Sequence, residues 1–111
     1  MLRVTDALDK VRAVLVKHGD ASKRVWINEY GWNTKDEGAK SRDLVTVLSA
    51  LQDNSTYEYV ELAQYLVLTD LPNAPKIGGH DYGLMDRDVD TLTITPRLSY
   101  ETFANFSKNA R

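Results

Sequence analysis

The sequence predicts an α/β protein built from parallel strand–helix units. Apolar residues recur at helical spacing in three segments, and two short β-branched and aromatic runs lie between those segments. The expected order is therefore helix, strand, helix, strand, long loop, helix, which is typical of parallel βα units. With 111 residues the chain has the length of one ordinary domain, and residues 1–111 are treated as a single domain.

The first helix is expected over residues 4–18. Thr5 or Asp6 is the expected cap at its start, since either side chain can accept a hydrogen bond from the first turn. The helix should end at His18 and Gly19, because glycine accepts the left-handed turn that closes many helices. Its apolar side is formed by Val4, Leu8, Val11 and Leu15.

The run RVWIN at residues 24–28 predicts the first strand. It shows no polar alternation, which suits a strand that is covered on both faces. Glu29 lies at the end of this run. Trp26 is expected in the core, because strand alternation places it on the face opposite Ile27 and Glu29.

A second helix is expected over residues 41–52, with Ser41 as a possible cap. Its apolar face contains Leu44, Leu48 and Leu51. A second strand is expected within residues 60–70, most securely at 62–68, and the Pro- and Gly-rich segment 71–83 should be a loop.

The last helix is expected to open at Thr95 and Pro96, with the threonine as cap and the proline in the first turn. Its apolar side is formed by Leu98, Tyr100, Phe103 and Phe106. Two buried parallel strands cannot pair their own outer edges, and parallel sheets normally contain more strands. The chain therefore has the character of a part of a larger sheet.

Composition excludes several classes of function. Apolar residues make up 42% and charged residues 27%, so the chain is globular and not disordered. The net charge is −2 and no basic run occurs, so the sequence does not indicate a surface that binds nucleic acid. The absence of cysteine excludes disulfides and thiolate metal sites. No apolar window is long enough for a membrane span, and the first ten residues lack the apolar core of a signal peptide, so localisation stays open.

The segment VWINEYGWNT at residues 25–34 resembles the seventh strand of clan A glycoside hydrolases, the retaining (β/α)8 barrels. Downstream, a leucine-rich helix, a strand ending at Asp70, the segment DYGLMD and the helix start TPRLSYETF follow the order of that family up to residue 106. The resemblance implies a partial TIM barrel, from helix 6 to helix 8, that needs a partner or an oligomer to close its sheet. A whole barrel has about 250 residues, so this chain has less than half of one.

The resemblance implies that Glu29 is the catalytic nucleophile for hydrolysis of O-glycosidic bonds. A retaining enzyme also needs an acid/base carboxylate, which the family places at the end of strand 4, outside this sequence. Asn28 precedes Glu29 and forms the Asn-Glu pair that the family uses for the acid/base, so that role stays open. The Gly-Trp that follows, and a remaining chain with room for about two strand–helix units, favour the nucleophile.

Four further residues are expected to bind substrate: Asn28, Tyr30, Trp32 and Asp70. Trp32 is equally suited to packing its loop onto the barrel rim, and Asp70 to capping a helix or loop. Leu68 stands where the family commonly has an aromatic platform for the sugar. The alternative for Glu29 is a structural role, either as a helix cap or in an ion pair with Arg24 or Lys35.

No cofactor and no metal are expected, because His18 and His80 are the only histidines and further ligands at a fixed spacing are not evident. The expected partners are a polysaccharide or oligosaccharide and a complementary barrel polypeptide or further copies of this chain. The alternative function is a non-catalytic structural or carbohydrate-binding oligomer subunit built from a barrel fragment.

Overall fold

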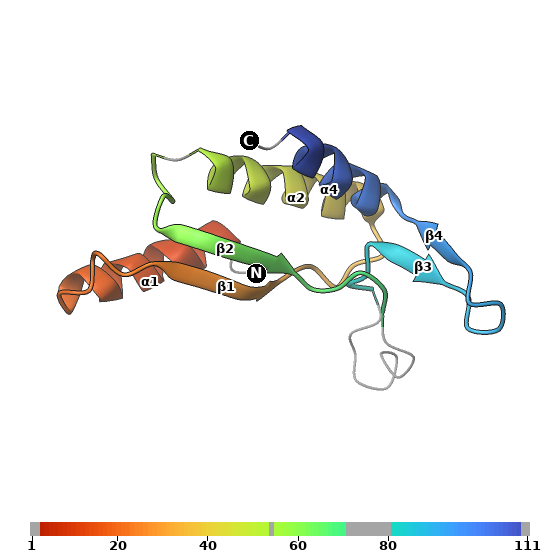
Figure 1. Ribbon diagram of the computed structural model, residues 1–111, viewed down its shortest axis with the longest axis horizontal. Helices are drawn as coiled ribbons and strands as arrows, with labels where there is room; N and C mark the ends of the chain where they lie inside the picture. Colours follow the sequence, from red (N-terminus) through yellow and green to blue (C-terminus); the bar gives the residue numbers. More distant parts are fainter. Residues whose placement is uncertain (1–2, 54, 71–80, 110–111) are drawn as a thin grey trace.

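The computed structural model describes residues 3–53, 55–70 and 81–109. Within these ranges the chain is a mixed α/β protein with two small sheets, and its strands form no closed barrel. Figure 1 shows the elements in chain order: α1 (Val4–Lys17), β1 (Val25–Tyr30), α2 (Glu37–Gln52), β2 (Val60–Tyr65), β3 (Met85–Arg87), β4 (Ile94–Pro96) and α4 (Leu98–Asn109).

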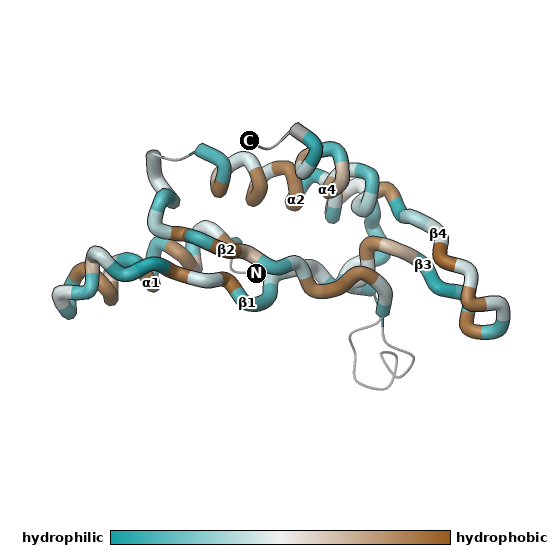
Figure 2. Tube along the Cα trace, viewed as in Figure 1, coloured by the Kyte–Doolittle hydropathy of each residue, from teal (hydrophilic) through white to brown (hydrophobic). Residues whose placement is uncertain are grey.

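The larger sheet is a βαβ unit. Strands β1 and β2 are parallel and are joined through α2, as the alternation of strands and helices predicts. Strands β3 and β4 form an antiparallel hairpin that projects from one end of the molecule. Thr69, beyond the end of β2, forms an isolated parallel bridge to Met85 of β3. Figure 2 shows apolar segments along this hairpin. The sequence patterns did not predict the hairpin.

The described helices pack on one face of the β1–β2 sheet. In Figure 1, α2 and α4 lie side by side over the sheet. Leu44 and Val47 of α2 pack with Tyr30, and Phe103 of α4 lies against the same cluster. Helix α1 covers the same face, because the cluster around Leu8 includes residues of β1 and of α2.

The other face of the sheet is bare among the described residues. Trp26 is 62% exposed there, and Leu62 is exposed beside it. The prediction that the first strand is covered on both faces, with Trp26 in the core, is therefore wrong for this chain. The physical reason is that α1, α2 and α4 all cover the opposite face, where Ile27 and Ala63 point.

The predicted helix boundaries are partly correct. Helix α1 ends as expected, with His18 as the cap residue and Gly19 at a φ of 79°. At its start, Arg3 takes the cap position and the Asp6 carboxylate accepts the Arg3 backbone N–H at 3.3 Å. Helix α2 begins four residues earlier than Ser41, because Asp36 caps it by accepting the Ala39 N–H at 2.9 Å.

The second half of the chain departs further from expectation. Strand β2 ends at Tyr65, short of the predicted 68–70. Pro96 closes β4 and is not in the first turn of the last helix, which begins at Leu98. Most of the predicted loop, residues 71–80, lies outside the described residues, as does His80. In the part of the chain that is described, no helix has the length and hydropathy needed to cross a membrane.

Candidate functional site at the end of β1

A β-bulge shapes the end of β1. Ile27 is opposite Ala63 and Tyr30 is opposite Tyr65, so three steps along β1 match two steps along β2. The extra residue turns Tyr30 back to the helix side that Ile27 already occupies. Asn28 and Glu29 are both exposed as a result.

Glu29 lies at the carboxyl end of a parallel strand with its side chain exposed. Among the described residues, no cation and no hydrogen-bond donor contacts its carboxylate, so the predicted alternative pairs with Arg24 and Lys35 do not form. Arg24 instead donates to the Glu58 carbonyl at 2.7 Å.

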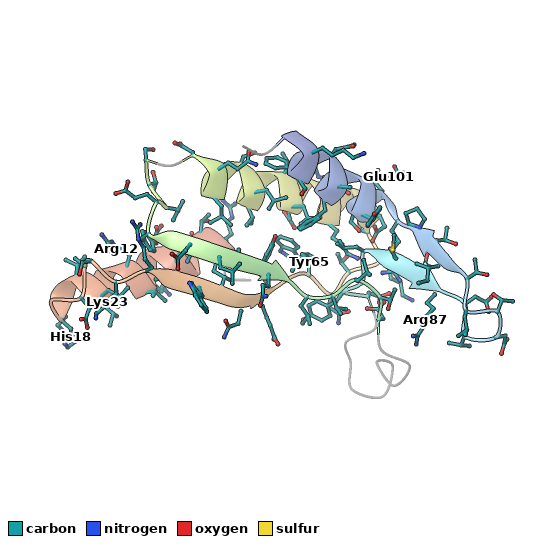
Figure 3. The ribbon with its side chains drawn as sticks, viewed as in Figure 1. Arg12, His18, Lys23, Tyr65, Arg87 and Glu101 are labelled. Carbon is teal, nitrogen blue, oxygen red and sulfur yellow. The ribbon has the colours of Figure 1, made fainter. Side chains whose placement is uncertain are left out.

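Tyr30 and Trp32 do not share the side of the sheet that Glu29 faces. Tyr30 is 6% exposed and packs edge-on against Trp32 and Tyr65, with ring centroids 6.1 and 5.4 Å apart. Burial raises the pKa of Tyr30 to about 12 and also raises the pKa of Tyr65. Figure 3 labels Tyr65, which extends between the sheet and the helices, where it meets Phe103. The structure thus places the Tyr30 ring in the core, where a sugar cannot stack on it.

Trp32 is half-buried on the helix side. It lines a pocket of about 340 Å³ together with Arg3 and Thr5 at the start of α1 and Asp43 and Thr46 of α2. The combination of an aromatic ring, charged groups and hydroxyls suits a small polar ligand. This pocket is a separate place from the exposed carboxylate of Glu29.

Gly31 permits the close approach of the two strand ends. A Cβ built on Gly31 would lie 2.5 Å from the Leu66 carbonyl oxygen and 3.2 Å from the Tyr82 ring. The adjoining hydrogen bond from the Leu66 N–H to the Tyr30 carbonyl, at 2.9 Å, fixes this approach. The Gly in the Glu-Tyr-Gly-Trp segment is therefore required by packing alone.

Asp70 is engaged with the β3–β4 hairpin. Its Oδ1 accepts the Gly83 N–H at 2.8 Å, and its Oδ2 pairs with the Arg97 guanidinium at 3.2 Å. Arg97 also pairs with Asp86 at 2.6 Å and donates to the Gly83 carbonyl at 2.7 Å. Burial alone would lower the pKa of Arg97, but these two carboxylates outweigh it and raise the value. Of the two roles expected for Asp70, the contacts favour the structural one, in fastening a loop.

A buried ionic network was missed by sequence reasoning. Lys40 is fully buried; its Nζ lies 2.8 Å from Glu37 and donates to the carbonyls of Asp81 and Gly83 at 2.8 and 3.1 Å. Glu37 also accepts the Ser99 N–H and hydroxyl, at 3.1 and 2.6 Å. Burial would raise the pKa of Glu37, but its hydrogen bonds with Lys40 and Ser99 lower it overall. The Glu–Lys spacing of three along a helix was a visible signal, whereas Ser99 gave none.

The bare face holds one more carboxylate. Glu61 accepts the Trp26 Nε1–H at 2.6 Å, near the amino ends of the strands. Trp26 and Glu29 are three residues apart along β1, which corresponds to about 10 Å. Glu61 is therefore too far from Glu29 to form the pair of carboxylates about 5 to 5.5 Å apart that retaining hydrolysis uses.

The remaining predicted residues are scattered. Asn28 is exposed next to Glu29 on the sheet, and Leu68 is 53% exposed beyond the end of β2. Within residues 3–53, 55–70 and 81–109, no group of three His, Cys, Asp or Glu side chains is placed to hold a metal ion. The structure thus brings Asn28 and Glu29 together and places Tyr30, Trp32 and Asp70 elsewhere.

Comparison of the chain with protein-family models, with curated proteins and with solved structures finds no match.

Proposed function

We propose that this chain is the C-terminal portion of a retaining glycoside hydrolase barrel, spanning helix 6 to helix 8, in which Glu29 is the nucleophile. In this proposal α1 is helix 6, β1 and β2 are strands 7 and 8, and α4 is helix 8. The resemblance of residues 25–34 to the seventh strand motivates it. The chain alone would be inactive, because the acid/base carboxylate belongs to strand 4.

The observation that carries the proposal is the position of Glu29. It is exposed, lacks a partner among the described residues, and lies at the carboxyl end of a parallel strand. In (β/α)8 enzymes, active sites lie at this end of the strands. The bulge before Tyr30 also supports the proposal, since bulges recur next to active sites, where they redirect a side chain.

The chemistry assigned to Glu29 is attack of a carboxylate oxygen on the anomeric carbon. The glycosidic bond breaks as the ester bond to Glu29 forms, and the acid of the missing strand 4 protonates the departing oxygen. Water then cleaves the ester, with the same acid acting as base. Asn28, exposed beside Glu29, is the residue of this chain placed to hydrogen-bond the sugar.

A mechanism-based label tests the proposal. The assembly containing a tagged chain, purified from its own source, is incubated with a panel of 2-deoxy-2-fluoroglycosyl fluorides, and its peptides are sequenced by mass spectrometry. The expected result is one glycosyl adduct on Glu29 that E29Q abolishes. E61Q is the matched control, because Glu61 is a carboxylate on the same bare face and should leave labelling intact. Absence of any adduct, or an adduct that survives in E29Q, refutes the assignment.

A second candidate is a non-catalytic structural or carbohydrate-binding subunit. It is favoured by Leu68, an exposed aliphatic residue where the family has an aromatic platform, and by the burial of Tyr30 away from any ligand. Sugar binding in such a subunit would use the pocket beside Trp32. Titration of oligosaccharides against W32A, with W26A as the control, distinguishes this site from the face that carries Glu29.

A further inference from the structure

We infer that the bare face of the β1–β2 sheet is a docking surface for a different polypeptide, one that presents basic and apolar side chains, and not for a second copy of this chain. The bare face consists of the exposed residues of strands β1 and β2. Its members are defined by their exposure: Trp26, Asn28, Glu29, Glu61, Leu62 and Gln64. Trp26 and Glu29 also line the groove between β1 and α1, so they lie toward the outer edge of β1. The inference depends on the shape and charge of the sheet and does not require the glycosidase proposal.

The first argument is that a parallel sheet with an open face is incomplete. Parallel strands are almost always covered on both faces, because their crossover helices and their neighbours bury them. Here the helices cover one face, while Trp26 remains 62% exposed on the other. An exposed tryptophan paired with an exposed leucine on a parallel sheet is consistent with a surface that another element covers.

The negative charge of the bare face favours a basic partner over a second copy of this chain. Glu29 and Glu61 are the ionisable residues of the bare face, and neither Lys nor Arg belongs to it. Two copies stacked through this face would enclose four carboxylates without a cation, which is a costly arrangement in a buried interface. Arg3, the cap residue before α1, lines the adjoining groove but forms no ion pair with Glu29. A partner with basic side chains resolves this repulsion.

Among the residues that the structure describes, the outer edge of β1 pairs with no other strand. A groove of about 370 Å³ runs beside it, lined on the helix side by apolar residues of α1 that include Leu8 and Val11. Val11 and Val14 of α1 remain exposed, at 45% and 58%. An extended strand added at this edge would pair with the β1 backbone, as in β-augmentation. Its alternate side chains would then be apolar toward α1 and basic toward Glu29.

Trp26 provides a direct reporter for the test. In the full chain carrying W32F, Trp26 is the single tryptophan, and covering the bare face should shift its emission to shorter wavelength. The probes are three nine-residue peptides in which Val alternates with Lys, Glu or Ser. The expected result is a blue shift with the Lys peptide at a Kd at least tenfold below that of the Glu peptide, weakening as salt is raised.

Two double variants locate the charge that matters. E29Q/E61Q should remove the preference for the Lys peptide, whereas E58Q/E101Q, which changes net charge equally at exposed sites off the bare face, should keep it. Equal binding of the Lys and Glu peptides, or no binding of either, overturns the inference. So does a blue shift that grows with protein concentration without peptide and coincides with a dimer in sedimentation, since it assigns the face to a second copy. Because no sugar is present, these outcomes are separate from the labelling of Glu29.

Discussion

Replacing Lys40 with methionine should destabilise the chain by breaking a buried ionic network. Lys40 is fully buried, and its ammonium group contacts the Glu37 carboxylate and the carbonyls of Asp81 and Gly83 within 3.1 Å. Methionine keeps most of the aliphatic volume but donates no hydrogen bond. The variant therefore tests the ionic network with little change in packing.

The expected magnitude follows from these contacts. Removing one partner of a buried ion pair costs about 3 to 5 kcal/mol, because the other charge stays buried without compensation. The Glu37 side chain is 24% exposed, so water and Ser99 compensate part of the loss. We expect a loss near the lower end, about 3 kcal/mol, which lowers Tm by at least about 12 °C in a domain of this size.

The assay is urea and thermal unfolding followed by circular dichroism at pH 7, with K10M as control, since Lys10 is exposed on α1. K40M, E37Q and the double variant complete a thermodynamic cycle. The double variant should be less destabilised than the sum of the single ones, because the pair is lost only once. A loss below about 1 kcal/mol for K40M, or additive effects in the cycle, would refute the assigned network.

The other predictions concern the core, the strand end and the exposed carboxylate. L44A should lose about 2 to 5 kcal/mol of unfolding free energy in urea, because Leu44 is fully buried, whereas V45A on the exposed side should lose much less. Above pH 10 the unfolded state ionises Tyr30 while the folded state keeps its proton up to about 12, so stability falls by up to about 1.4 kcal/mol per pH unit; Y30F should reduce this fall between about pH 10 and 12, and an unchanged slope contradicts the burial of the hydroxyl. G31A should cost about 1 to 3 kcal/mol, since its Cβ would meet a backbone carbonyl, and a neutral effect would show that the strand ends separate easily. E29Q should change unfolding free energy by less than about 0.5 kcal/mol, because the carboxylate has no structural partner among the described residues, and a larger loss would indicate a structural role.

The order of elements was predictable because it depends on local patterns. The 3.6-residue repeat of Leu8 and its neighbours, and the left-handed conformation that Gly19 accepts, specify α1 without reference to tertiary contacts. The start of α2 was placed too late because Asp36, and not Ser41, provides the capping oxygen. The β3–β4 hairpin was missed because its strands have three residues each, too few for a periodic signal.

The arrangement of the candidate site was not predictable from alternation along the strand. A strict two-residue period puts Ile27 and Glu29 on one face, but the bulge returns Tyr30 to the helix side and exposes both Asn28 and Glu29. A bulge depends on the register between two strands, which the β1 sequence alone does not encode. Burial of Trp26 was expected for a similar reason, since strand composition does not reveal whether a second layer is present.

Native mass spectrometry of the protein taken from its own source tests whether a different polypeptide completes the open β1–β2 sheet. We expect the 12.6 kDa chain in a complex with a second chain, of about 150 to 200 residues if the proposed barrel is correct. A spectrum that contains only multiples of 12.6 kDa would show that no different polypeptide completes the sheet.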